Sequence, residues 1–310
     1  MRRTIITGAT GALGIALIHE LTAHGVEVLA ICRPNSPRIS QIPNHPLVSV
    51  RCCDLADLDT IENDTEKQYD VFYHFGWEGT TGEARNNMHL QNRNVTYALS
   101  AVELAKRFGC QLFIGAGSQA EYGRSNGPLR ADTPTLPENG YGYGKLCAGL
   151  MTRTLAHQTG MKHIWLRILS VYGPGDGAQS LIMSLISKLK KGETPECTKG
   201  EQQWDYLYSA DAAKALRLIA ERGIDGKVYV LGSGKARPLA EYIREIRDIV
   251  APEADVAFGA IPYGPQQVMY LQADTTELVH DTGWKPEVPF SEGISEILRR
   301  EGNCSLTGTK

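Results

Sequence analysis

The hydrophobic pattern of the first half of the chain alternates between two periods. Short runs of consecutive apolar residues are typical of strands buried on both faces, and apolar residues recurring every three or four positions are typical of helices. We expect strands at residues 5–6, 26–32, 47–53, 70–75, 111–115 and 162–169, and helices directly after Gly14, at 87–108 and at 141–158. This alternation predicts a parallel sheet with helices on both faces.

The pattern becomes less regular after Asp176. Helices are predicted at 180–191, 211–221 and 239–250, and a buried strand at 227–231 that we expect to return to the main sheet. The prediction is an α/β fold: a doubly wound parallel sheet in 1–169, completed by 205–235, with a smaller mixed α/β lobe from 170–204 and 236–302. Residues 303–310 are polar and without pattern, so we expect a flexible tail there.

A glycine-rich turn separates the first strand from the first helix. Gly8, Gly11 and Gly14 recur at every third position. Without a Cβ, such a turn lets a phosphate approach the backbone N–H groups at a positively polarised helix N-terminus. The turn therefore predicts a seat for a dinucleotide pyrophosphate at the carboxyl edge of the sheet, the alternative being a tight turn without a ligand.

Composition excludes several kinds of partner. The net charge is −3 over 310 residues, and Lys and Arg are scattered, so neither a nucleic-acid groove nor an anionic membrane surface is expected. No apolar run is long enough to span a bilayer. Seven cysteines without a C-x-x-C pair fit a reduced, cytoplasmic protein. We expect a small-molecule ligand and no metal.

Tyr141 and Lys145 lie four residues apart on a predicted helix, so their side chains share one face. A nearby ammonium lowers the pKa of a phenol, which makes Tyr141 a candidate proton donor to a carbonyl oxygen. Ser118, at the end of the fifth strand, is placed to donate to the same oxygen. Each signal is weak alone, because helices often carry Tyr and Lys and a turn serine often bonds its own backbone.

Several motifs occur in order and together resemble the extended short-chain dehydrogenase/reductase family of nucleotide-sugar epimerases, dehydratases and ketoreductases. They are Gly8-x-x-Gly11-x-x-Gly14, Asp54-Leu55, Asn94, Ser118 before Tyr122-Gly123, Tyr141-x-x-x-Lys145, Arg167-x-x-Ser170-Val171-Tyr172-Gly173-Pro174-Gly175 and Gly283-Trp284-Lys285-Pro286. The resemblance covers nearly the whole chain and implies a Rossmann-type fold with an NAD(P) cofactor and a sugar-nucleotide substrate.

The resemblance also implies roles for individual residues. Ser118, Tyr141 and Lys145 are the expected catalytic residues. Expected cofactor-binding residues are Gly8, Thr10, Gly11, Ala12, Leu13, Gly14, Arg33, Asp54, Leu55, Phe75, Gly76, Trp77, Asn94, Tyr141, Lys145, Leu169 and Val171. Expected substrate-binding residues are Trp77, Ser118, Gln119, Tyr141, Ser170 and Trp204.

Departures from the family pattern narrow the reaction. Gln119 and Ala120 stand where dehydratases of the family have Asp and Glu, which argues against dehydration. Arg33 follows the second strand, where an acidic residue would bind the NAD ribose, so a 2′-phosphate is favoured and NADPH is expected rather than NAD. A solvated loop arginine is the alternative.

The resemblance and these departures together predict an NADPH-dependent 4-ketoreductase of a nucleotide-linked 4-keto-6-deoxy sugar. An NAD-dependent nucleotide-sugar 4-epimerase is the alternative, and a non-catalytic NADP-binding regulator is a remote one. A homodimer formed through helices 87–108 and 141–158 is expected, as in relatives. Trp204 stands where many relatives have a diphosphate-binding arginine, which leaves Arg167, Lys188 and Arg237 as open alternatives.

Overall fold

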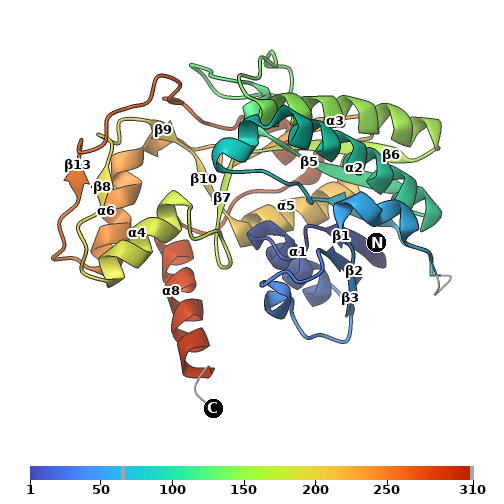
Figure 1. Cartoon of the computed structure of the whole chain (residues 1–310), viewed down its shortest axis with the longest axis horizontal. Helices are drawn as coiled ribbons and strands as arrows, with labels where there is room; N and C mark the ends of the chain where they lie inside the picture. The colour runs from blue at the N-terminus through green and yellow to red at the C-terminus, as the bar shows by residue number, and fades with distance from the viewer. Residues whose placement is uncertain (64–66, 308–310) are drawn as a thin grey trace.

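The computed structural model describes residues 1–63 and 67–307, those after 301 by their backbone alone (Figure 1). Its centre is a seven-stranded sheet in the order β11-β6-β5-β4-β1-β2-β3. The strands are β1 (Arg3–Thr7), β2 (Glu27–Cys32), β3 (Val48–Cys52), β4 (Val71–His74), β5 (Leu112–Ser118), β6 (Lys162–Ile168) and β11 (Val228–Leu231). Every pairing is parallel. The doubly wound sheet and the return of its last strand are confirmed.

Helices cover both faces of this sheet. Figure 1 shows α2 (Met88–Arg107) and α3 (Gly140–Gln158) side by side over one face, with α1 (Ala12–Ala23) and α5 (Ser209–Arg222) on the other. The strands bury apolar side chains toward both layers, because each face of a parallel sheet is covered. Short 3₁₀ turns follow several strands: η1 (Ile39–Gln41), η2 (Leu55–Thr60), η3 (Gly82–Asn86) and η4 (Gln119–Glu121).

The second lobe has a core of its own. Its helices α4 (Leu181–Lys190), α6 (Leu239–Val250) and α8 (Phe290–Thr307) pack around aliphatic and aromatic side chains, among them Tyr172, Tyr242 and Phe290. Three two-stranded ribbons lie outside the main sheet. They are β7 (Ser170–Tyr172) with β10 (Tyr206–Tyr208), β9 (Gln203–Trp204) with β12 (Arg237–Pro238), and β8 (Glu196–Cys197) with β13 (Ala257–Phe258).

Two segments differ from expectation. Helix α7 (Thr276–Thr282) and Trp284, expected in the lobe, pack on the main core instead, where Trp284 is fully buried and its indole N–H donates to the Asp211 carbonyl. A large apolar ring is buried wherever the chain can reach a core, regardless of its place in the sequence. Residues 303–307 continue α8 rather than forming a tail, and 308–310 lie outside the described residues. Within the described chain, no helix is long and apolar enough to cross a membrane.

Candidate active site

The glycine turn lies where β1 and β4 are neighbours and the chain departs from the sheet in opposite directions, the usual ligand crevice of such sheets. Gly8 has φ of +68°, and a Cβ there would lie 2.7 Å from the Gly76 nitrogen. A Cβ on Gly14 would lie 2.7 Å from the Gly8 oxygen. At Gly11 the nearest atom would be 3.5 Å away, an ordinary contact. Gly8 and Gly14 are therefore required by the fold, whereas Gly11 leaves space that the protein does not use.

Helix α1 begins directly after this space. Its N-cap, Gly11, makes no side-chain capping bond, and its first turn holds no acidic residue. Thr10, Ala12 and Leu13 are half-buried beside it. Uncapped N–H groups and the positive end of the helix dipole attract phosphate, so this turn fits the pyrophosphate of a dinucleotide.

The segment after β4 lies beside the glycine turn. Thr7 Oγ1 accepts a hydrogen bond from the Gly76 N–H at 3.3 Å. A Cβ on Gly76 would overlap Leu55, which starts η2 after its N-cap, Asp54. Phe75 is half-buried between these groups. The structure thus brings these predicted cofactor residues together around the glycine turn.

Asn94 supports the segment after β4 from α2. Its side-chain oxygen accepts from the Glu78 N–H at 2.8 Å, and its amide donates to the Glu78 carbonyl at 2.9 Å. The amide also donates to the carbonyl of Leu90. Asn94 is buried, and both polar atoms of its side chain hydrogen-bond backbone groups, so it holds the loop after β4 in place.

Arg33 follows β2 directly and is exposed. Among the described residues, its guanidinium has no hydrogen-bond, ion-pair or ring partner. Burial raises the pKa of the Asp176 carboxyl, and the charge of Arg38, in the same loop as Arg33, partly opposes this rise. Arg33 is therefore a free cation at the carboxyl edge of the sheet.

Ser118, Tyr141 and Lys145 converge at the adjoining ends of β5 and α3. Ser118 ends β5, and its side chain lies close enough to the phenol of Tyr141, in the first turn of α3, to oppose the rise that burial causes in the pKa of that phenol. Lys145 is buried, and its ammonium donates to the Ala116 carbonyl at 2.6 Å. A Cβ on Gly142 would overlap the Ala120 carbonyl, so α3 packs directly on the turn that carries Ser118. The grouping expected from the sequence is present.

Burial alters the proton affinity of both titratable members of this group. It raises the pKa of Tyr141, whereas the sequence predicted a pKa lowered by the Lys145 ammonium. Ser118 and the Arg85 guanidinium, which lies 4.3 Å from the ring centre, reduce this rise. Burial lowers the pKa of Lys145 to about 7, against the opposing charge of Glu121. The ammonium and the neutral amine of Lys145 are therefore both accessible near neutral pH.

Trp77 covers the other side of the catalytic group. The Lys145 ammonium lies 3.9 Å from the centre of the indole, and the Tyr141 ring meets it edge-on at 6.2 Å. The Trp77 indole N–H donates to Gln91 Oε1 at 2.8 Å, and the Gln91 amide in turn donates to the carbonyls of Gly79 and Ala84. The indole is held rigidly and attracts the charged form of Lys145. Neither Gln91 nor Arg85 stood out in the sequence, since both read as polar loop or helix residues.

The lobe reaches the same edge of the sheet through β7. Ile168 is in register with Ser118, so Leu169, Ser170 and Val171 continue from the strand beside the catalytic group. The Ser170 hydroxyl accepts from the Trp204 indole N–H at 2.9 Å. Gln119 is half-buried in the turn after Ser118. The predicted substrate residues therefore come from the ends of β4 and β5, the first turn of α3, and the strands β7 and β9, which Trp204 and Ser170 join by their hydrogen bond.

Arg167 was one of three basic residues that the sequence left open as ligands of the diphosphate, and its contacts argue against that role. Its guanidinium binds Glu121 at 2.8 Å and the Ala131 carbonyl at 3.0 Å, and it is nearly fully buried. It is thus committed to an internal ion pair. Arg237 pairs with Glu245 and stacks 3.9 Å above the Tyr242 ring, and Lys188 lies on α4.

Glu121 was not singled out from the sequence, yet it is fully buried directly behind Ser118. It accepts from the Ser118 N–H at 2.8 Å and completes a capping box with that residue. The signal was present, because Ser118-Gln119-Ala120-Glu121 has the S-x-x-E spacing of a capping box. Its burial and its partners on β6 only follow from the tertiary structure.

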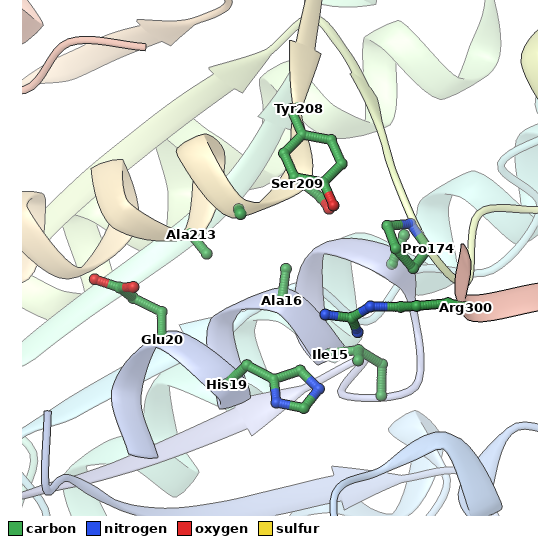
Figure 2. Close-up of a pocket in the computed structure, with 11 residues that line it drawn as sticks. Ile15, Ala16, His19, Glu20, Pro174, Tyr208, Ser209, Ala213 and Arg300 are labelled. Carbon is green, nitrogen blue, oxygen red and sulfur yellow. The ribbon is translucent and has the colours of Figure 1, made fainter. Parts of the chain in front are cut away.

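A separate hollow lies between α1, the start of α5 and Arg300 of α8 (Figure 2). Arg300 enters it from α8, and Ile15, His19, Pro174 and Ser209 line its walls. Of the residues predicted for the site, only Ala12 contributes to it. This hollow is therefore distinct from the candidate active site.

The fold and these residues define a dinucleotide-binding Rossmann protein with a Ser–Tyr–Lys group at the carboxyl edge of its sheet. The chain belongs to the NAD dependent epimerase/dehydratase family, whose model matches residues 4–232. It is an enzyme of the oxidoreductase type.

Individual relatives span nearly the whole chain. CDP-abequose synthase of Salmonella typhimurium is 25% identical over 96% of this chain and 97% of its own length. The dTDP-4-dehydro-6-deoxyglucose reductase of Escherichia coli is 26% identical over 95% of this chain and 96% of its own. The structure of UDP-glucose 4-epimerase from Thermotoga maritima superposes with a TM-score of 0.87 at 19% identity, covering 98% of this chain and 99% of that one. The last likeness concerns the fold.

The different demands on Gly11 and Gly14 can be tested separately. Gly11→Ala should lower the free energy of unfolding by less than about 1 kcal/mol, because its Cβ fits and only the N-cap preference is lost. It should weaken dinucleotide binding by ~10-fold or more by pushing the pyrophosphate off the N–H groups. Gly14→Ala should instead lower the free energy of unfolding by about 1–3 kcal/mol. Urea denaturation and cofactor titration check both; unchanged affinity in Gly11→Ala would contradict the assignment.

Proposed function

We propose that the protein is an NADPH-dependent ketoreductase that reduces the 4-keto group of a nucleotide-linked 4-keto-6-deoxy sugar. The observation that carries this choice is the free, exposed Arg33 after β2, where a carboxylate would favour NAD. The 4-keto-6-deoxy sugar is suggested by the Escherichia coli relative, a dTDP-4-dehydro-6-deoxyglucose reductase.

The residues of the site have complementary parts in such a reduction. Bound NADPH would supply the hydride. The turn at Gly11 would hold the pyrophosphate, and Lys145 would hold the nicotinamide ribose and stabilise the tyrosinate. Tyr141 would give its phenolic proton to the sugar oxygen as charge develops there, and Ser118 would donate a hydrogen bond to the same oxygen. Trp77 would exclude water from the face of Lys145.

Dehydration has no support in this site. Gln119 and Ala120 carry no titratable group, and Glu121 is fully buried and paired with Arg167. An acid and a base for removing water from the sugar are therefore not present beside Ser118.

A nucleotide-sugar 4-epimerase is the second candidate. The family model that matches the chain is named for epimerases and dehydratases, and Ser118, Tyr141 and Lys145 would act on a C4 oxygen in a reduction or an epimerisation. The two activities differ in the cofactor: an epimerase returns the hydride it has taken, whereas a reductase consumes NADPH.

The reduction can be assayed directly with a panel of 4-keto-6-deoxy sugar nucleotides. At least one should be reduced with stoichiometric oxidation of NADPH, and Tyr141→Phe should lower kcat by ~10²–10⁴-fold while leaving NADPH binding unchanged, since only the proton donor is lost. Tyr143→Phe, an exposed neighbour on α3, is the matched control and should retain activity. Interconversion of two sugar nucleotides by protein purified with bound NAD, without added cofactor, would establish the epimerase instead.

Cofactor choice should depend on Arg33. Arg33→Ala should weaken NADPH binding by ~10–100-fold, the value of about 1.5–3 kcal/mol for hydrogen bonds to a charged group, and leave NADH binding nearly unchanged. Titration of both cofactors measures this. Arg51→Ala, which alters another arginine of the same sheet edge, is the control. Equal weakening of NADPH and NADH would mean that Arg33 does not contact a 2′-phosphate.

We further propose a homodimer built on α2 and α3. Leu150 and Met151 are exposed on α3, and with Leu99 of α2 they line an apolar groove between the two helices. The wild type should sediment as a dimer, and Leu150→Glu as a monomer, because the charge would be buried at the interface. Leu136→Glu, on an exposed loop, should leave the dimer intact. A monomeric wild-type mass would contradict the proposal.

A further inference from the structure

Glu121 is a fully buried carboxylate that the reduction does not use. Burying a charge is unfavourable unless partners satisfy it, so its position needs a reason. The carboxylate binds the backbone N–H of Ser118, the residue expected to orient the substrate oxygen.

The partners of Glu121 account for both of its oxygens. Oε1 accepts from the Ser118 N–H at 2.8 Å and from the Trp165 indole N–H at 3.0 Å. Oε2 accepts from Arg167 Nε at 2.8 Å. Arg167 is itself fixed by the Ala131 carbonyl and by the Tyr122 ring, whose centre lies 4.5 Å from its guanidinium carbon. The carboxylate therefore has little freedom to move.

Three glycines make room for this arrangement. A Cβ on Gly117 would overlap both the Glu121 carboxylate and the Trp165 indole nitrogen. A Cβ on Gly115 would overlap the Trp165 ring, and one on Gly149 of α3 would lie 2.7 Å from it. All three have negative φ or extended backbone, so their lack of a side chain serves packing and not a turn. Glycine in a strand weakens it, so this space has a cost that the seating of Trp165 and Glu121 offsets.

The turn that carries Ser118 is thus held from two sides. Glu121 holds the Ser118 N–H on one side, and α3 packs through Gly142 on the Ala120 carbonyl on the other. The Ser118 oxygen accepts from the Ala120 N–H at 3.2 Å, which leaves its O–H free to donate. The distance between the Ser118 oxygen and Tyr141 is consequently set by the same contacts that hold the turn.

We propose that Glu121 is a positioning residue, which fixes the backbone of Ser118 so that the Ser118 and Tyr141 hydroxyls converge on one substrate oxygen. This inference rests on the proposed function only in that both hydroxyls act on that oxygen. A purely structural capping role predicts a loss of stability without a specific link to the Ser118 hydroxyl.

A double-mutant cycle between Glu121→Gln and Ser118→Ala separates the two roles. Glu121→Gln should lower kcat by ~10–100-fold, the effect of misplacing a reacting group by about 1 Å, with KM and the NADPH dissociation constant changed less than ~2-fold. In the Ser118→Ala background the same change should lower kcat less than ~2-fold further, because the hydroxyl that Glu121 positions is already absent. If Glu121 were only a structural cap, its contact with the Ser118 N–H would persist in Ser118→Ala, because that variant keeps the N–H. The two losses of kcat would then multiply in the double variant.

Two further variants separate the positioning role of Glu121 from a general loss of stability. Arg167→Met leaves the Glu121 contact with Ser118 in place and should lower Tm as much as Glu121→Gln while retaining kcat within ~3-fold, since only a charge partner is lost. If Glu121→Gln does not fold, Trp165→Phe removes one donor from the same carboxylate and should show a smaller loss of kcat with the same dependence on Ser118. Losses of kcat that follow Tm across all variants, or that multiply with Ser118→Ala, would overturn the proposal.

The cycle also distinguishes this inference from the proposed function. If the wild type epimerises rather than reduces, the reductase assignment fails, and the same cycle is measured on epimerisation, where Ser118 and Tyr141 face the same oxygen. If the wild type reduces keto sugars but Glu121→Gln behaves like the wild type, the inference about Glu121 fails alone.

Discussion

The candidate site depends on backbone segments that approach more closely than any side chain allows. At the junction of β1 and β4, Gly8 touches Gly76 and Gly14 touches Gly8, which brings the start of α1 to the mouth of the crevice. At the end of β5, Gly142 lets α3 rest on the turn after Ser118. Because these contacts involve backbone, which cannot change rotamer, the glycine turn and the turn after Ser118 are each held firmly in place.

Burial determines the pKa values of the titratable side chains near Ser118 and Tyr141. Lys145 is almost fully enclosed by the indole of Trp77, the end of β5 and its own helix, and this lowers its pKa to about 7. The charge of Glu121, behind the turn, opposes the effect. His74, under the crevice, has its pKa lowered to about 3 by burial, so it remains neutral and adds no competing cation. Ser118, Tyr141 and Lys145, the candidate catalytic residues, thus lie where burial has the largest effect on the pKa of both titratable members.

Arginines illustrate how burial separates similar residues. Arg33 is exposed and without a partner in the described chain, whereas Arg167 is enclosed by Glu121, Ala131 and the Tyr122 ring. A free guanidinium is available to a phosphate, and a paired one is part of the packing. The sequence shows only that Arg33 comes directly after one predicted strand and that Arg167 lies near the end of another.

Much of this molecule was determined by the sequence alone. The periods of the apolar positions predicted all seven strands and the helices around the main sheet, and the spacing of Tyr141 and Lys145 predicted that both side chains share one helix face, because both signals are local. The tertiary structure alone decided which groups meet across the sheet. Glu121 and Trp165 are 44 residues apart, and the Trp284 ring reaches α5 from 73 residues away. Local patterns carry no information about such pairings, because they arise from the order in which the strands assemble.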